Sequence, residues 1–401
     1  MHSTRKVKDD LIYVGGSDRR LSRFENLFPI PKGVSYNSYV LLDEKTVLFD
    51  TADESISRQY IENVVHALNG RPLDYMVVQH MEPDHCAMID DMLRRYPEVK
   101  MVCSAKAVGM FAQFYGTDVA ARALVVKEGD KLSTGEHTLH FVMAPMVHWP
   151  EVMVTYDEKD KILFSADAFG TFGALAGNIF DDEITFDTTW MNDPRRYYTN
   201  IVGKYGVQVQ TLLKKAASLD IEMICPLHGP IWHKDLGLLL EKYQKWSTYE
   251  PEDKTVMIAY ATMYGNTENA ANVLAGMLAD KGVKNIAMYD VSETDVSELV
   301  AESFRCSHLV LAAPTYNSGI QPKMEAYLSD IKALNLQNRT VAVIDNGTWA
   351  ATAGKQMIGM LEGMKNMTIL ENPISIKSAL AENQLGALEA LADELAKQVN
   401  G

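Results

Sequence analysis

Residues 79–85 read Gln79-His80-Met81-Glu82-Pro83-Asp84-His85, so four metal-binding side chains fall within six positions. The apolar run Tyr75–Gln79 predicts a buried strand that ends directly on His80. Loops that follow strands carry chemistry on a rigid support. A lone histidine is more often structural than a ligand, and the alternative here is a polar loop with a helix cap at Asp84. Two histidines and two carboxylates on a loop stiffened by proline favour a metal site.

Three further candidate ligands each follow a predicted strand. They are His148 in the segment 144–150, Asp167 in the segment 165–170 and His228 in the segment 225–230. Because the strand ends of a sandwich share an edge, we expect all of these side chains to converge. The predicted metal site is therefore His80, Glu82, Asp84, His85, His148, Asp167 and His228. His233 is a tempting eighth ligand, but a surface position at a helix start is the favoured interpretation.

The order of these residues resembles the metallo-β-lactamase fold, whose hydrolases carry an HxHxDH loop followed by His, Asp and His. Glu82 stands where those hydrolases have a second histidine. Mixed imidazole and carboxylate ligands with open positions suit redox-active iron, whereas zinc sites commonly favour histidine and cysteine. Asp167 is the natural carboxylate to bridge two metals. The chemistry of the ligands alone leaves zinc or manganese open.

The N-terminal part of the chain predicts short strands mixed with helices. A hairpin is expected around Asp43-Glu44-Lys45, and a helix over Ile56–Leu68. The expected strands are Ser38–Leu42, Thr46–Asp50, Tyr75–Gln79, Lys100–Ser104, Thr138–Met143, Val152–Tyr156, Ile162–Ser165 and Glu222–Cys225. The polar stretch Ser247–Lys254 marks a change of pattern, so we expect domains at residues 1–250 and 254–401.

The C-terminal part predicts five strands that alternate with helices. The expected strands are Thr255–Tyr260, Asn285–Asp290, His308–Ala312, Thr340–Ile344 and Met367–Leu370. The expected helices lie near Thr267–Lys281, Asp295–Glu302, Lys323–Lys332, Lys355–Lys365 and Asn383–Gln398. Such alternation predicts an α/β fold with a doubly wound parallel sheet of flavodoxin size.

A flavin site is predicted at three strand ends of this second domain. The first strand runs into a glycine-containing loop and a helix N-terminus, which together form a phosphate cradle. The cradle has neither the lysine of a Walker loop nor a GxGxxG fingerprint, so it suits the monophosphate of FMN. An ordinary capped helix would explain only one of its threonines. The predicted flavin-binding residues are Thr262, Met263, Tyr264, Gly265, Asn266, Thr267, Pro314, Thr315, Tyr316, Asn317, Asn346, Gly347, Thr348 and Trp349.

The composition excludes several classes of function. A formal net charge of −15 argues against binding nucleic acid through its phosphates. The start of the chain has no apolar leader, and no run approaches the roughly 18 apolar residues of a membrane helix. The four cysteines form no CxxC pair, which excludes a built-in rubredoxin and favours a reducing compartment. A cytoplasmic protein is therefore expected.

A metal loop of the form HxExDH, followed by His, Asp and His and fused to a C-terminal flavodoxin module, resembles the flavodiiron proteins. The resemblance covers nearly the whole chain and implies a metallo-β-lactamase-like αββα sandwich followed by the flavin domain. It implies FMN and two non-haem iron ions as cofactors. One ion would be held by His80, Glu82, His148 and Asp167. The other would be held by Asp84, His85 and His228, with Asp167 as the bridge. In some relatives the counterpart of His85 stays outside the ligand set.

This resemblance implies an oxidoreductase that reduces O2 to water, NO to N2O, or both. FMN would take electrons from an external donor and pass them singly to the iron pair. A separate rubredoxin is the expected donor, with a reduced deazaflavin or a flavin reductase as alternatives. A head-to-tail homodimer, or a tetramer of such dimers, would bring the flavin of one chain near the iron of the other. Tyr197 and Trp149 are candidates for the surroundings of the metals, although packing is the favoured role of each.

Three alternatives stay open from the sequence. The first is an enzyme that primarily reduces NO, because the same ligands serve both gases. The second is a metal-dependent hydrolase with an appended flavodoxin module, against which Glu82 and the flavin cradle both count. The third is an electron-transfer or redox-sensing protein with a closed structural metal, against which the carboxylate-rich ligand set counts.

Overall fold

The computed structural model describes residues 1–185 and 190–401. The chain forms two compact units, one of residues 1–198 and 207–241 and the other of residues 199–206 and 242–401. Helix α7 (Leu236–Thr248) ends and strand β17 (Asp253–Tyr260) begins within the polar stretch Ser247–Lys254, in which the sequence predicted a boundary. Within the described residues, every helix is too short or too polar to cross a bilayer.

The first unit contains two β-sheets. The larger runs in the order β1 (Arg5–Lys6), β2 (Leu11–Tyr13), β7 (Tyr39–Leu42), β8 (Thr46–Phe49), β9 (Tyr75–Val78), β10 (Lys100–Ser104) and β11 (Ala123–Val126). Strands β7 and β8 form the predicted antiparallel hairpin, and β8 to β11 are parallel. The smaller sheet runs in the order β12 (Lys131–Ser133), β13 (Thr138–Met143), β14 (Met153–Asp157), β15 (Ile162–Phe164) and β16 (Met223–Cys225).

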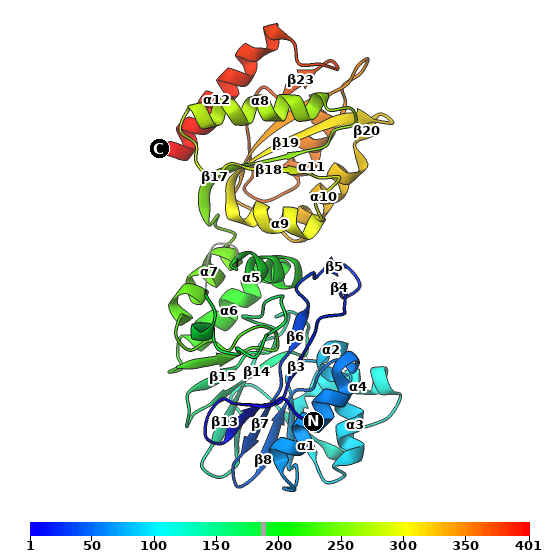
Figure 1. Ribbon diagram of the computed structural model, residues 1–401, viewed down its shortest axis with the longest axis vertical. Helices are drawn as coiled ribbons and strands as arrows, with labels where there is room; N and C mark the ends of the chain where they lie inside the picture. The colour runs from blue at the N-terminus through cyan, green and yellow to red at the C-terminus, as the bar shows by residue number, and fades with distance from the viewer. Residues whose placement is uncertain (186–189) are drawn as a thin grey trace. The chain divides into compact units, whose positions relative to one another are not determined.

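The two sheets bury one hydrophobic core between them. Leu41, Phe49 and Val77 from the larger sheet share this core with Phe141 and Phe164 from the smaller one. The rings of Phe49 and Phe164 stack with their centroids 3.8 Å apart. Figure 1 shows α1 (Ser57–Leu68), α3 (Ile89–Arg95) and α4 (Ala105–Tyr115) on the outer side of the larger sheet, and α6 (Gly206–Ala216) on the side of the smaller one. The predicted αββα sandwich is confirmed.

The second unit is built on a parallel sheet. Its order is β18 (Ala287–Asp290), β17, β19 (Cys306–Tyr316), β21 (Thr340–Asn346) and β22 (Thr368–Ile369), which is the 2-1-3-4-5 order of flavodoxins. The sequence predicted these five strands to within a few residues. It missed β23 (Ile374–Ile376), which pairs with the C-terminal end of β21 after a break in the last strand, and β20 (Gly319–Ile320), which pairs with β19.

Helices cover both faces of this sheet (Figure 1). Alternate residues of β17 point to opposite faces, so Val256 and Ile258 pack against α8 (Asn266–Asp280) and α12 (Leu385–Asn400). Met257 and Ala259 pack on the other face, which is covered by α9 (Val296–Arg305), α10 (Pro322–Ala333) and α11 (Ala353–Glu362). Burial on both faces explains why these strands read as continuous apolar runs. The predicted doubly wound α/β domain is confirmed.

Candidate metal centre and flavin pocket

The seven predicted metal ligands come together in the first unit. His80 follows β9, and the short helix α2 (Pro83–Cys86) carries Asp84 and His85, with Pro83 at the first helical position. His148, Asp167 and His228 lie on the loops after β13, β15 and β16. All seven side chains are buried. The structure therefore brings together side chains that lie far apart in the sequence.

One group consists of His80, Glu82, His148 and Asp167, with one ligand atom of each within 4.8 Å of the others. Glu82 Oε2 lies 3.2 Å from His80 Nε2 and 3.0 Å from His148 Nε2. Asp167 Oδ2 lies 3.1 Å from each of the same two nitrogens. Two imidazole nitrogens and two carboxylate oxygens thus face one small volume.

The second group consists of Asp84, His85 and His228. The Nε2 atoms of His85 and His228 are 3.0 Å apart, and Asp84 Oδ2 lies 3.2 Å from His228 Nε2. Asp167 Oδ1 lies 3.1 Å from His85 Nε2, while its other oxygen faces the first group. Asp167 therefore stands between the groups with one oxygen toward each, which is the geometry of a bridging carboxylate.

The chemistry of the donors fits a pair of cations. Both carboxylate oxygens of Asp84 and Oδ1 of Asp167 are buried, yet none has a hydrogen-bond partner among the described residues. Buried carboxylates without donors are costly unless a positive charge lies beside them. Oxygen and imidazole ligands of this mixture suit iron and similar divalent ions.

The backbone around Asp167 is held in strained conformations. Ala166 and Phe169 have positive φ angles of 51° and 69°, which side chains with a Cβ rarely adopt. Such strain is typical of residues that a surrounding structure forces into place at a functional site. Gly229 follows His228 with φ +77°, and a Cβ there would lie 2.0 Å from Thr171 Cγ2. Only glycine fits at that position.

Three residues that support the histidines were missed by the sequence interpretation. Glu151 Oε1 accepts a hydrogen bond of 2.8 Å from His80 Nδ1 and another from the backbone N–H of Met81. The backbone carbonyl of Ser35 accepts a 2.7 Å bond from His228 Nδ1. Asp50 accepts hydrogen bonds from the backbone N–H groups of residues 79 and 80, where the metal loop begins. Glu151 could have been found from the sequence, because it is a carboxylate three positions after His148. The carbonyl of Ser35 could not, because every residue has a backbone carbonyl.

The two aromatic candidates pack against the metal-binding histidines. The Trp149 ring lies with its centroid 5.4 Å from that of His80, and the Tyr197 ring lies 5.4 Å from that of His228. A carboxyl group from farther away also reaches the site. Glu25, at a tight turn with φ 51°, lies near Glu82, and the negative charge of this neighbouring carboxylate raises the pKa of Glu25.

Protons compete with metal ions for this site. Burial opposes a charge on His148, but hydrogen bonds to Asp167 and Glu82 outweigh it and raise the pKa of His148 to about 9. A histidine must be neutral to bind a metal, so we expect the affinity for Fe²⁺ to increase from about pH 6 to about pH 9. Anaerobic titration of the metal-free chain with Fe²⁺ at several pH values measures this. An affinity that does not change over that range would contradict the prediction.

The remaining histidine–carboxylate groups differ from the metal groups. His233 is partly exposed and bonds Asp182 at 3.0 Å, outside both groups, as the favoured interpretation expected. His137 is buried between Asp157 and Asp10, where Lys159 Nζ lies 3.0 Å from Asp10 Oδ2. The lysine ammonium already supplies the positive charge there, so this is an ion-pair network.

The predicted flavin residues line a pocket of about 460 Å³ in the second unit. That volume lies in the usual range for small-ligand sites. All of the predicted residues border it except Gly265, whose N–H bonds Thr262 Oγ1 and shapes the turn. Trp349 and Tyr264 expose 94% and 90% of their surface, so large apolar rings stand free beside the pocket. A flat aromatic ligand would cover them.

Two polar residues of this pocket also brace its loops. Asn346 Nδ2 donates to Ser378 O and to Thr267 Oγ1, and Ser378 N–H donates back to Asn346 Oδ1. Thr315 Oγ1 accepts the N–H groups of Thr352 and Ala353 at the start of α11. Ser318, Ala350, Thr352 and Ser378 line the pocket as well and were missed by the sequence interpretation. Ser378 was missed because the strand before it, β23, was not predicted.

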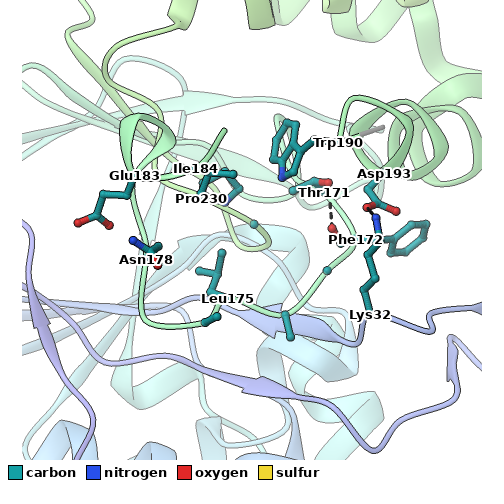
Figure 2. A pocket seen from close by; sticks show the side chains of 14 residues that line it. Lys32, Thr171, Phe172, Leu175, Asn178, Glu183, Ile184, Trp190, Asp193 and Pro230 are labelled. Atoms are coloured by element: carbon teal, nitrogen blue, oxygen red, sulfur yellow. Dashed lines mark hydrogen bonds and ion pairs between the residues drawn. The ribbon is translucent and has the colours of Figure 1, made fainter. Parts of the chain in front are cut away.

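Another cavity, of about 350 Å³, lies in the first unit (Figure 2). Phe172, Leu175 and Trp190 line it, and Lys32 Nζ pairs with Asp193 Oδ2 at 2.6 Å on its wall. None of the seven predicted metal ligands borders it. It is therefore separate from the metal centre, although it is next to the loop that follows Asp167.

Comparison with known families matches each half of the chain. Residues 34–229 match the family described as ODP family beta lactamase. Residues 258–399 match the flavodoxin family. The two matches fall on the two kinds of domain that the structure contains.

Relatives and solved structures cover the chain almost end to end. The anaerobic nitric oxide reductase flavorubredoxin of Aeromonas hydrophila is 30% identical over 86% of this chain and 70% of its own length. The flavodiiron protein of Giardia intestinalis is 25% identical, with a TM-score of 0.93 over 99% of this chain and 96% of that one. The rubredoxin oxygen:oxidoreductase of Desulfovibrio gigas is 28% identical, with a TM-score of 0.91 over 99% and 98%.

The fold and the site define a flavoprotein oxidoreductase whose paired metal groups lie on a metallo-β-lactamase-like sandwich. The chain belongs to the flavodiiron protein family. Its cofactors are accordingly FMN, in the flavodoxin-like domain, and a non-haem di-iron site, as the sequence predicted.

Proposed function

We propose that this protein reduces O2 to water, NO to N2O, or both, with electrons that reach a di-iron site through FMN. The observation that carries the proposal is Asp167, whose two oxygens face two separate groups of buried ligands. Two metals joined in this way can each offer an open position to a small gas molecule. Reduction of O2 consumes four electrons and four protons, and coupling of two NO consumes two of each and releases one water.

The ligands that we propose are the two groups already described. His80, Glu82, His148 and Asp167 would hold one iron, and Asp84, His85, His228 and Asp167 the other. The position of His85 Nε2, 3.0 Å from His228 Nε2 and 3.1 Å from Asp167 Oδ1, supports its inclusion. The FMN phosphate would lie at the N-terminus of α8, where Thr262–Thr267 form the cradle. The isoalloxazine ring would lie between Tyr316 and Trp349.

An external electron donor is part of this proposal. A rubredoxin is the first choice, since the Desulfovibrio gigas structure is named for that donor, and a deazaflavin or a flavin reductase is the alternative. We further propose a head-to-tail homodimer, or a tetramer of such dimers, in the cytoplasm. We propose a division into domains at residues 1–250 and 254–401, which the end of α7 and the start of β17 support.

An enzyme that primarily reduces NO is the second candidate, because the flavorubredoxin relatives are named anaerobic nitric oxide reductases. The experiment that separates the two is anaerobic reduction of the purified protein followed by mixing with each gas. Rapid reoxidation by O2 with water as the product supports oxygen reduction, whereas far faster consumption of NO with N2O as the product favours the second candidate. Zinc in place of iron, with no reaction toward either gas, would overturn the proposal and favour a hydrolase.

A further inference from the structure

The histidines of the two metal groups differ in what lies behind them. The ring nitrogen of His80 that points away from the metal group, Nδ1, donates to a carboxylate oxygen of Glu151 at 2.8 Å. Both side chains are fully buried. The same carboxylate oxygen accepts the N–H of Met81, so it acts only as an acceptor and the proton sits on His80 Nδ1. The Nε2 lone pair of His80 is therefore free to face the metal group.

Among the described residues, no carboxylate plays this part in the second group. His228 Nδ1 donates to the neutral backbone carbonyl of Ser35 at 2.7 Å. His85 Nδ1 is buried and finds no hydrogen-bond partner in the part of the chain that the structure describes. Within residues 1–185 and 190–401, one group thus has a full negative charge behind a histidine, and the other has a carbonyl dipole behind His228 and no hydrogen-bond partner for Nδ1 of His85.

This difference has an electronic consequence. A carboxylate behind a ligating histidine draws its N–H proton closer, which makes the other ring nitrogen a stronger donor to a metal. Negative charge in a buried site also stabilises the more highly charged oxidation state of a nearby ion, because the low dielectric hardly screens it. A neutral carbonyl strengthens the metal-binding nitrogen less, and it stabilises the ferric ion less.

Resting on the proposed di-iron function, we propose that Glu151 is a positioning residue that makes the two irons unequal. The ion held by His80 would have a lower reduction potential than the ion held by His228, so it would stay ferric longer during reduction. The first electron from the flavin would therefore reduce the ion held by His228 from ferric to ferrous, and the second would reduce the ion held by His80. Each step adds one electron to one ion and breaks no bond.

The position of Glu151 is fixed independently of any metal. Its backbone carbonyl accepts the hydroxyl of Ser104 at 2.8 Å, and Ser104 is also the N-cap of α4. Its side chain bonds the backbone at Met81, in the loop after the neighbouring strand β9. The carboxylate is therefore anchored at both ends, and a glutamine of the same shape can take its place with its amide oxygen toward His80.

The test compares Glu151→Gln with the unmodified protein, both loaded with iron. A redox titration followed by EPR reports the one-electron-reduced pair and the potentials of the two steps. We expect the second, lower-potential step to move toward the first in Glu151→Gln, with FMN content and the first step unchanged. A tenfold shift in the preference for ferrous iron corresponds to about 59 mV for one electron.

A second variant, Glu151→Ala, separates the role of Glu151 in positioning His80 from the effect of its negative charge. It removes the support of His80 altogether, and we expect the affinity of one iron per chain to fall by about 10- to 100-fold while the other iron is retained. Asp157→Asn is the matched control, because Asp157 accepts a 2.8 Å bond from His137 Nδ1 in the same unit but outside the metal groups. It should leave both potentials and the iron content as they are.

The outcomes distinguish this inference from the proposed function. Unchanged potentials in Glu151→Gln, equal shifts of both steps, or loss of both irons from Glu151→Ala would overturn the role of Glu151. Those results can arise while the unmodified protein still holds two irons and reduces its gas. If instead the unmodified protein holds no redox-active iron pair, the proposed function itself fails.

Discussion

Asp167→Asn is expected to empty both metal sites while FMN stays bound. One carboxylate oxygen of Asp167 lies 3.1 Å from His80 Nε2 and the other 3.1 Å from His85 Nε2, so both groups lose a ligand at once. An amide offers one oxygen and turns N–H donors toward the other group. It also removes a charge that offsets the cations in a fully buried position. Weakening of iron binding by more than about 100-fold is expected, since even outer partners of metal ligands contribute 10- to 100-fold.

Iron and flavin content of the purified variant measure this result directly. We expect less than one iron per chain, a normal flavin spectrum, and no consumption of O2 or NO. Asp157→Asn again serves as the control, because it changes another buried aspartate that pairs with a histidine in the same unit. If Asp167→Asn retained two irons per chain, Asp167 would not be the bridge.

Arg339→Met is expected to lower the free energy of unfolding of the flavin domain by about 3–5 kcal/mol. The Arg339 side chain is 1% exposed and donates to five backbone carbonyls. Two of these, Ser303 O and Phe304 O, belong to the last turn of α9, whose carbonyls have no partners within the helix. A third is Tyr249 O, just before β17. Methionine fills similar space but leaves these acceptors without a donor.

Burial lowers the pKa of Arg339 to about 10, so the side chain is still charged at neutral pH and remains a donor. Urea denaturation followed by flavin release measures the loss of stability. Lys281→Met is the control, because Lys281 pairs with the exposed carboxylates of Glu389 and Asp393 in the same domain and its replacement should cost much less stability. Equal costs for the two variants would show that the carbonyl contacts of Arg339 are not what holds these segments together.

The sequence predicted much of this fold because its local patterns agree with the tertiary structure. The parallel strands of the flavin domain are buried on both faces, so they stand out as apolar runs, and β19 and β21 begin within two residues of their predicted positions. Short edge strands carry a weaker signal. Strands β11 and β23 were missed, since only part of each is buried and neither shows a long apolar run.

The metal loop at residues 79–85 and the three later ligands were predicted from residue type and position alone. Side chains that bind metals are few, and their placement directly after strands is visible in the sequence. The flavin residues were likewise predicted from strand ends, although the bracing role of Asn346 depends on Ser378, a partner 32 residues away. That pairing exists only because β23 lies beside β21.

The sequence by itself determined which chemistry the protein contains: four histidines and three carboxylates for metals, and a cradle for a flavin phosphate. The resemblance to flavodiiron proteins implied how those ligands divide, but only the tertiary structure gave the distances between them and placed one oxygen of Asp167 toward each group. It also decided that Glu151 lies behind one histidine and a backbone carbonyl behind another. The reason is physical. Residue type encodes what an atom can bind, whereas the distance between atoms far apart in the chain depends on how strands and loops pack.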